Sequence, residues 1–203
     1  MIAIIDYGAG NIFSVKNALD FLRIPGKLTA DPKEIRKADA LILPGVGAFP
    51  SAMEMLRSSG LVEAIQEQAH KKPFLGICLG MQLLFEKGYE FEECNGLGLI
   101  PGSIEKIEAP GFVIPHMGWN KLEKSNPCPI LEGLPEEAYV YFVHSYQAVV
   151  PEAYLAASVE YGTAKIPAMV YDGKTVFGAQ FHPEKSGEVG LQILWNFAAR
   201  CKN

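Results

Sequence analysis

The N-terminal half of the sequence alternates short apolar runs with longer segments of helical periodicity. The apolar runs are Ile2–Asp6, Ala40–Gly45 and Pro73–Ile77, and each leads into a turn that contains glycine. Two segments between them, Ile12–Leu22 and Pro50–His70, have the apolar spacing of amphipathic helices, and the second is expected to break near Ser58-Ser59-Gly60. Strands and helices in alternation require parallel strands joined by right-handed crossovers. The pattern predicts an open α/β sheet flanked by helices, with ligands bound beyond the carboxyl ends of its strands.

The second half of the sequence has a different character. Strand-like stretches within residues 96–184 are separated by glycine, proline and an Asp172-Gly173 pair, which predicts hairpins and antiparallel strands beside the parallel ones. Gly187–Arg200 has the pattern of a closing amphipathic helix. The 203 residues contain no internal repeat and no linker. We expect a single domain, residues 1–203, with an open, mostly parallel central sheet flanked by helices and additional antiparallel strands.

Composition and charge exclude several classes of partner. Hydrophobic residues make up 49% of the sequence and charged residues 20%, as in ordinary globular proteins. The net charge is −5 and no basic run is long enough to follow a phosphate backbone, so no nucleic acid partner is expected. No apolar run approaches the roughly 20 residues needed to cross a bilayer, so no membrane association is expected.

The cysteines and histidines bear on the compartment and on metal binding. The four cysteines form no C-x-x-C pair, and the N-terminus lacks the charged start and long apolar core of a signal peptide. A reducing cytoplasm is therefore the expected location. The four histidines lack the spacing of metal ligands, so we expect neither a metal nor another cofactor.

Cys78 lies between two glycines where a strand-like run gives way to a helix-like one. The stretch Gly76-Ile77-Cys78-Leu79-Gly80 has the spacing of G-x-S-x-G with sulfur in place of oxygen, and Met81–Glu86 is predicted to start a helix. The two glycines permit the tight backbone of a turn that exposes a nucleophile. A cysteine is often only a small buried hydrophobic residue. The pentapeptide alone leaves both interpretations open.

A nucleophilic thiolate needs an adjacent base, usually an imidazole that a third group orients. The tripeptide His182-Pro183-Glu184 follows a predicted strand, Val176–Phe181, and so lies at a carboxyl end, as Cys78 does. Because Pro183 restricts His182 to an extended backbone, the side chains of His182 and Glu184 are expected to point the same way. A polar turn without chemistry is the alternative for this tripeptide. In an α/β chain with the cysteine turn, a Cys-His-acid triad is the favoured interpretation.

These motifs resemble those of the class I, or triad, glutamine amidotransferases, and within that family the glutaminase subunits of imidazole glycerol phosphate synthases. The family pattern lies in Gly76–Gln82 and in His182-Pro183-Glu184. The subfamily pattern lies in further segments spread along the chain: Asp6–Asn11, Pro44–Phe49, Pro115–Asn120, Phe142–Tyr146 and Lys185–Gly187. Chance is a poor explanation for a likeness of this breadth.

The resemblance implies a specific reaction. Cys78 attacks the side-chain amide of glutamine to give a glutamyl thioester and ammonia, while His182 transfers protons and Glu184 orients His182. Water then releases glutamate. The tetrahedral oxyanion needs backbone N–H donors, which the family places at Leu79, directly after the nucleophile, and on the turn Gly45-Val46-Gly47. A plain turn at the end of a strand would explain these glycines as well.

The resemblance also implies where the substrate binds. Gln82, one helical turn after Cys78, and the segment His144-Ser145-Tyr146 are the implied contacts for the amino acid end of glutamine. Without the family, Gln82 would be a solvated helix residue and Tyr146 a packed strand residue. The sequence departs from the family at Gln147, where a second aromatic residue is common. This difference concerns local packing and no catalytic role.

Ammonia released into water would be protonated and lost, so a glutaminase of this kind has to act while docked on its acceptor. The resemblance implies a separate (β/α)8-barrel cyclase, which uses the ammonia to form imidazole glycerol phosphate and an aminoimidazole carboxamide ribotide. Four residues are expected at or near the interface of this heterodimer by their position: Asn11, Met117, Trp119 and Lys185. Otherwise, Trp119 would be a core aromatic residue and Lys185 a solvated charge.

Other functions are compatible with the same motifs. The triad could serve another amidotransferase, such as the glutaminase of pyridoxal phosphate synthesis, although Asp6–Asn11 and Pro115–Asn120 argue against this. A stand-alone Cys-His-Glu γ-glutamyl hydrolase or peptidase would turn over without a partner. A non-catalytic binding module would be indifferent to the loss of Cys78, and the intact triad argues against it.

Overall fold

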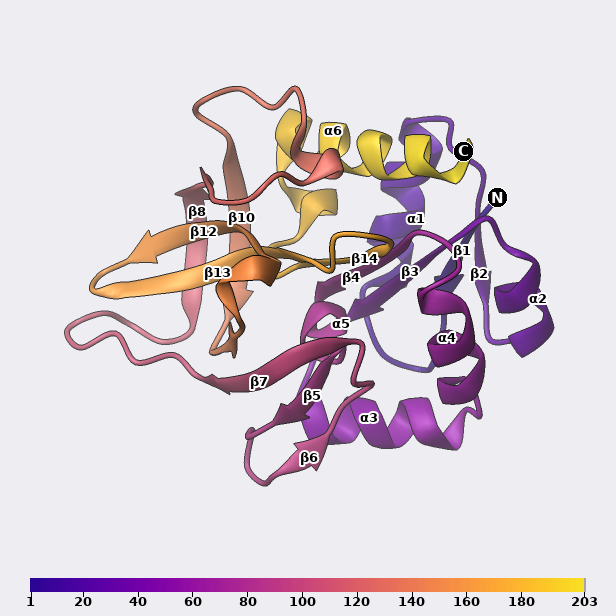
Figure 1. Cartoon of the computed structure of the whole chain (residues 1–203), viewed down its shortest axis with the longest axis horizontal. Coiled ribbons are helices and arrows are strands. Elements are labelled where there is room, and N and C mark those ends of the chain that lie inside the picture. Colours follow the sequence, from indigo (N-terminus) through magenta and orange to yellow (C-terminus); the bar gives the residue numbers. More distant parts are fainter. Residues whose placement is uncertain (203) are drawn as a thin grey trace.

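The computed structural model of the protein describes the backbone of residues 1–202 and the side chains of residues 1–201. Its centre is an eight-stranded sheet (Figure 1). In the order in which they lie side by side, its strands are β2 (Gly26–Thr29), β1 (Ile2–Ile5), β3 (Ala40–Gly45), β4 (Phe74–Cys78), β14 (Val176–Ala179), β13 (Ala164–Tyr171), β12 (Leu155–Tyr161) and β9 (Glu123–Lys124).

The sheet is parallel from β2 to β14 and antiparallel beyond β14. β1, β3 and β4 are buried along their whole length, as expected for parallel strands that are covered on both faces.

The α-helices are α1 (Ile12–Phe21), α2 (Pro32–Lys37), α3 (Phe49–Ser58), α4 (Val62–Ala69), α5 (Leu79–Gln82) and α6 (Gly187–Ala199).

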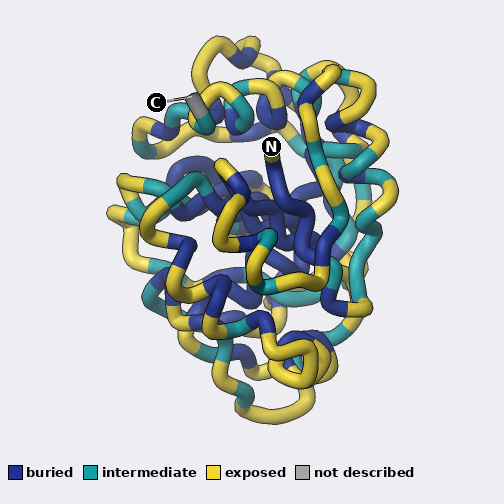
Figure 2. The backbone as a smooth tube through the Cα atoms, turned by 90° about the vertical axis from the view of Figure 1, so that its right-hand side faces the viewer, coloured by how far each residue is buried: buried dark blue, intermediate teal, exposed yellow. Residues whose placement is uncertain are grey.

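Alternate residues of the central strands supply two hydrophobic cores, one on each face of the sheet. Ile2 and Ile4 of β1 belong to the core that contains apolar residues of α1 and α6. Ala3 and Ile5 belong to the core that contains apolar residues of α2, α3 and α4. The buried strands lie in the middle of the molecule, dark blue in Figure 2, with exposed backbone around them. This arrangement fixes the carboxyl ends of β3, β4 and β14 next to one another.

Two smaller sheets accompany the central sheet. β8 (His116–Lys121) and β10 (Tyr139–His144) form an antiparallel pair. The other sheet contains, in spatial order, β11 (Tyr146–Val149), β7 (Ile100–Lys106), β5 (Phe85–Gly88) and β6 (Cys94–Asn95). Short 3-10 helices complete the described residues: η1 (Pro129–Leu131), η2 (Glu152–Tyr154), η3 (Pro183–Lys185) and η4 (Arg200–Lys202).

The structure confirms the predicted fold class, a mostly parallel central sheet with antiparallel strands and flanking helices. The observed bounds of β1, β3, β4, α1 and α6 agree with the predicted segments to within a residue at each end. The predicted strand Val176–Phe181 is shorter, because β14 ends at Ala179.

The prediction of a helix at Met81–Glu86 is wrong. α5 is one turn long and ends at Gln82, and the chain enters the second sheet as β5 from Phe85 onward. Leu83, Leu84 and Phe85 are completely buried. A short apolar run of this kind does not distinguish a buried helix from a buried strand.

No helix in the described part of the chain is long and apolar enough to cross a membrane.

We infer that residues 1–202 form one domain, because the central sheet joins strands from both halves of the sequence.

Candidate active site

Cys78 lies at a sharp turn between β4 and α5. Its backbone has φ 54° and ψ −114°, a conformation that is costly for a residue with a side chain. Such a turn directs a nucleophile out of the carboxyl end of a sheet. Cys78 is paired in register with Gly45, the last residue of β3. The predicted nucleophile and the predicted oxyanion turn are therefore neighbours.

The two glycines that flank Cys78 are required by close packing. A Cβ atom on Gly80 would lie 1.8 Å from the carbonyl oxygen of Leu43 on β3. A Cβ atom on Gly76 would lie 2.6 Å from the carbonyl oxygen of Gly80. No side chain fits at either distance, so the start of α5 can approach the sheet only because both positions are glycine. The Gly-x-Cys-x-Gly pattern thus specifies the turn itself.

His182 follows β14 and forms a backbone hydrogen bond with β10, a strand of the two-stranded sheet. Its backbone N–H donates to the carbonyl oxygen of Tyr141 over 3.0 Å, and its own carbonyl oxygen accepts from the Ser186 hydroxyl over 2.6 Å. The His182 Nδ1 atom lies 2.8 Å from Oε1 of Glu184, and both side chains are buried. The predicted His182–Glu184 contact is confirmed. The backbone is extended at His182, as expected, and it turns into η3 from Pro183.

The surroundings of His182 favour its charged form. Burial opposes the charge, but interactions with Cys78 and Glu184 outweigh it and raise the pKa of His182 to about 9. The Nε2 atom of His182 is buried and forms no regular hydrogen bond with the side chains that the structure describes. The Cys78 Sγ atom interacts with His182 and has long contacts at 3.9 Å to the carbonyl oxygen of Val143 and at 4.0 Å to Nε2 of Gln180. The sulfur and the ring nitrogen are thus available for reaction.

A pocket of about 310 Å³ opens over these groups, within the range of small-molecule sites. The residues that line it are Val46, Gly47, Cys78, Leu79, Gln82, Glu90, Pro115, Val143, His144, Ser145, Tyr146 and His182. All four predicted substrate contacts are among them. Of the predicted oxyanion residues, only Gly45 is not part of the lining.

The turn Gly45-Val46-Gly47 lies at the rim of this pocket. Gly45 ends β3, and a Cβ atom there would lie 2.7 Å from the backbone nitrogen of Gly80. Val46 is 46% exposed, and Gly47 has φ +105°, which glycine adopts most easily. Gly45 therefore serves close packing, whereas the exposed part of the turn is free of packing constraints.

Gln82 and His144 are tied to the same carbonyl group. The Gln82 Nε2 atom donates to the carbonyl oxygen of Tyr146 over 3.1 Å and to Oε1 of Gln180 over 3.0 Å. The His144 Nδ1 atom lies 2.8 Å from the same Tyr146 oxygen. Gln82 is buried and is not a solvated helix residue. Its amide N–H bonds are both used within the protein, so its carbonyl oxygen is the atom left for a ligand.

Comparison with known proteins identifies the family. The sequence pattern of glutamine amidotransferase class-I matches residues 3–201. The chain belongs to the class-I glutamine amidotransferase family. The resemblance that the motifs indicated is thereby confirmed.

Relatives and solved structures agree with this family. Two relatives, each named imidazole glycerol phosphate synthase subunit HisH, come from Bacillus thuringiensis (strain Al Hakam) and Bacillus cereus (strain 03BB102). Each is 52% identical over 198 residues, which is 97% of this chain and 93% of the relative. A crystal structure described as glutamine amidotransferase has a TM-score of 0.77 at 20% identity and covers 100% of both chains. PurLQS from Thermotoga maritima has a TM-score of 0.75 at 19% identity, over 97% of this chain and 96% of that one. These two structures support the fold.

Sequence reasoning missed two residues of the candidate site. Gln180 is completely buried and bridges Gln82 and Cys78. Its place at the end of a predicted strand, two residues before His182, was the available signal. Glu90 lines the pocket and accepts from the backbone N–H of Phe49 over 2.7 Å. Nothing in the local sequence distinguishes Glu90 from a solvated acid.

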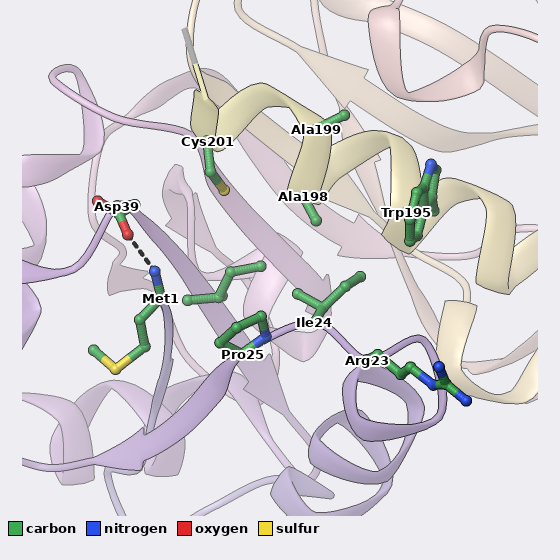
Figure 3. Close-up of a pocket in the computed structure, with 10 residues that line it drawn as sticks. Met1, Arg23, Ile24, Pro25, Asp39, Trp195, Ala198, Ala199 and Cys201 are labelled. Carbon is green, nitrogen blue, oxygen red and sulfur yellow. Dashed lines mark hydrogen bonds and ion pairs between the residues drawn. The ribbon is translucent and has the colours of Figure 1, made fainter.

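A second pocket, of about 350 Å³, shares no lining residue with the first. It is formed where the N-terminus meets the last turns of α6, and Met1 and Asp39 form an ion pair at its edge (Figure 3). Ile24, Pro25 and Trp195 give it a mostly apolar wall. None of the predicted site residues lines it. Residues 1–201 also contain no group of three or more His, Cys, Asp or Glu side chains that could hold a metal ion.

The predicted interface residues lie at the surface. Met117 and Trp119 alternate along β8 and are 59% and 54% exposed, so Trp119 is not a core residue. The Trp119 ring packs edge-on against Tyr141, with centroids 5.9 Å apart. Lys185 is exposed on η3, and Asn11 is half-buried at the start of α1.

Proposed function

We propose that the chain is the glutaminase subunit of an imidazole glycerol phosphate synthase. In this role it hydrolyses glutamine to glutamate and ammonia and passes the ammonia to a separate (β/α)8-barrel cyclase in histidine biosynthesis. The observation that carries the proposal is that Cys78, at its strained turn, and His182, which Glu184 orients, line the same pocket. The identity to the two Bacillus relatives supports the choice of acceptor.

In the proposed reaction the Cys78 thiolate attacks the side-chain carbonyl carbon of glutamine. The thiolate is the nucleophilic form of cysteine, and His182 is the group that takes up and returns the proton. The tetrahedral intermediate collapses as its C–N bond breaks, and His182 donates a proton to the departing nitrogen. Ammonia and a glutamyl thioester result. Neutral His182 then removes a proton from water, which attacks the thioester and releases glutamate and the thiolate.

The oxyanion of each tetrahedral intermediate needs N–H donors that face it. We assign one to the backbone of Leu79, directly after Cys78, and the second to the turn of Gly45, Val46 and Gly47. The exposed turn beside the buried Gly45 supports this assignment, because its peptide groups can rotate without repacking a core. A turn of this kind would also allow a docked partner to control the activity.

We assign the amino acid end of the substrate to the wall opposite Cys78. The carbonyl oxygen of Gln82 can accept from the substrate ammonium group, and Ser145 and Tyr146 can contact its carboxylate and methylenes. His144 and Gln82 both bond to the Tyr146 carbonyl oxygen, which supports a fixed wall at this place.

We assign the cyclase interface to the surface that carries Asn11, Met117, Trp119 and Lys185. The exposed aromatic and apolar side chains on β8 support this assignment, because such groups are enriched at protein interfaces. The net charge of −5 is consistent with a partner that is not a nucleic acid. We also propose a cytoplasmic location, since Cys78, Cys94 and Cys128 form no disulfide.

The test is glutamate release from glutamine by the purified chain, alone and with the cyclase and its nucleotide ligand. We expect strong activation by the liganded cyclase and loss of activity in Cys78→Ala. Equal activity with and without the cyclase would point to another acceptor or to a stand-alone γ-glutamyl hydrolase. Activity that survives Cys78→Ala would overturn the triad.

A further inference from the structure

A row of hydrogen-bond contacts runs behind the pocket from β12 to β11. Asn120 Nδ2 donates to the carbonyl oxygen of Glu160 over 3.1 Å, and Asn120 Oδ1 lies 2.8 Å from His116 Nε2. His116 Nδ1 lies 2.9 Å from His144 Nε2. His144 Nδ1 lies 2.8 Å from the carbonyl oxygen of Tyr146. Both histidines are buried.

The carbonyl groups at the two ends of this row determine how many N–H groups the row requires. The carbonyl groups of Glu160 and Tyr146 can only accept. Asn120 must therefore turn its N–H toward Glu160 and its oxygen toward His116, which makes His116 Nε2 a donor. At the other end, His144 Nδ1 must be a donor. The contact between the two rings needs one further proton, so three contacts require three N–H groups. Two neutral imidazoles carry only two.

The surroundings of His116 suit a cation. Two aromatic rings pack against the His116 ring: Phe142 is stacked on it, with centroids 4.8 Å apart, and the tilted ring of Tyr161 has its centroid 4.2 Å away. Faces of aromatic rings attract cations, most strongly where water is excluded. His116 thus has a hydrogen-bond contact at each nitrogen and two aromatic rings packed against it.

The other titratable groups nearby decide which ring takes the proton. His144 is closer to the cationic His182, and burial, together with repulsion from His116 and His182, lowers the pKa of His144 to about 3. Burial also lowers the pKa of His116, and the hydrogen bond to Asn120 offsets only part of this effect, so the assignment of the proton to His116 rests on the hydrogen-bond count. The Glu160 side chain is exposed, and no described carboxylate forms an ion pair with His116 or His144.

We propose that His116 is an imidazolium ion at neutral pH and holds His144 as the neutral Nδ1–H tautomer. His116 is then a positioning residue: it acts through His144 on the Tyr146 carbonyl oxygen, to which Gln82 also donates. Loss of the third proton would break one contact in the row and loosen this wall of the pocket. The link to glutamine binding rests on the proposed function, whereas the protonation of His116 does not.

The first test is nitrogen NMR of the chain labelled with 15N-histidine, without substrate or partner. The sequence has only four histidines, so single substitutions of His70, His144 and His182 assign all the signals, each by the signals that it removes. We expect both nitrogens of His116 to be protonated at pH 7 and only Nδ1 of His144. A neutral His116 at pH 7 would overturn the proposal, whatever the chain does with glutamine.

The second test uses a matched pair of variants at Tyr161. Tyr161→Leu removes the ring face and should lower the pKa of His116 by about one unit. Tyr161→Phe keeps the ring and should leave that pKa close to the wild-type value. In the complex with the cyclase, KM for glutamine should rise as the pH passes the pKa of His116. This rise should therefore occur at a lower pH in Tyr161→Leu than in Tyr161→Phe, with kcat unchanged in both variants. An equal shift of the His116 pKa in both variants would contradict the role of the ring.

Discussion

At the scale of single residues, the chemistry depends on the charge of His182. The pKa of His182 is raised to about 9 in the folded protein, against an ordinary value near 6.5. A group whose pKa rises on folding adds stability below the unfolded pKa and loses it as the pH rises through the folded pKa. For His182 this contribution is complete below about pH 6.5 and is lost toward pH 9.

The stability difference between wild type and His182→Asn should therefore depend on pH. We expect the wild type to gain on the order of 3 kcal/mol in the free energy of unfolding at pH 6 relative to pH 10, beyond any change in the variant. Urea unfolding across this pH range measures the difference. A difference that stays constant, or that grows as the pH rises, would contradict the charged His182.

Tyr7 carries a second polar group that matters for stability, a buried hydroxyl. Its hydroxyl is buried, forms no hydrogen bond with the described residues, and lies close to Gly45. Burial, with the nearby Cys78, raises the pKa of Tyr7, so the hydroxyl is neutral. Tyr7→Phe should raise the free energy of unfolding by about 1 kcal/mol, since it removes an unsatisfied group and keeps the ring. A loss of stability in urea unfolding would show that the hydroxyl has a partner.

At the scale of elements, the turn from β4 to α5 depends on its two glycines, Gly76 and Gly80. Gly80→Ala should destabilise the protein by about 3 kcal/mol or more, because its Cβ would collide with the Leu43 carbonyl oxygen. Gly173→Ala is the matched control, since Gly173 has φ +80° and open space around it. It should cost only about 1–2 kcal/mol of backbone strain. Thermal unfolding that ranks the two variants equally would contradict the packing argument.

Elements that are buried completely or along one face could be predicted from the sequence. Short elements with few buried residues could not. β1, β3 and β4 are continuous apolar runs and were recognisable. β2 was not predicted, because it is an edge strand with a single buried residue. α2 has an N-cap at Asp31, which accepts from the backbone N–H of Lys33, but its six residues are too few to show a period.

The site shows the same division. Cys78, His182 and Glu184 were predictable, because nucleophile, base and acid are few in type and follow the ends of predicted strands. Gln180 was not, because its part in the site depends on a hydrogen bond to Gln82, which is 98 positions away. The contact between His116 and His144 likewise arises from the pairing of β8 with β10. Contacts of this kind need the tertiary fold.

At the scale of the whole molecule, the two tryptophans provide a test of the assigned cyclase interface. Trp119 and Trp195 are 54% and 53% exposed, but only Trp119 lies on β8, whereas Trp195 lies on α6 beside the terminal pocket (Figure 3). Trp119→Ala should weaken binding of the cyclase by roughly 30-fold, and Trp195→Ala should leave it unchanged. Calorimetric titration of each variant with the cyclase gives the two values. Equal losses, or none, would move the interface elsewhere.

The covalent intermediate tests the central claim most directly. The chain, mixed with glutamine and the liganded cyclase and quenched in acid, can be digested and weighed by mass spectrometry. We predict a glutamyl adduct on the peptide that contains Cys78, increased by the cyclase and absent from Cys78→Ala. Rapid glutamate release with no adduct on Cys78, or with an adduct on another residue, would contradict a thioester mechanism at this turn.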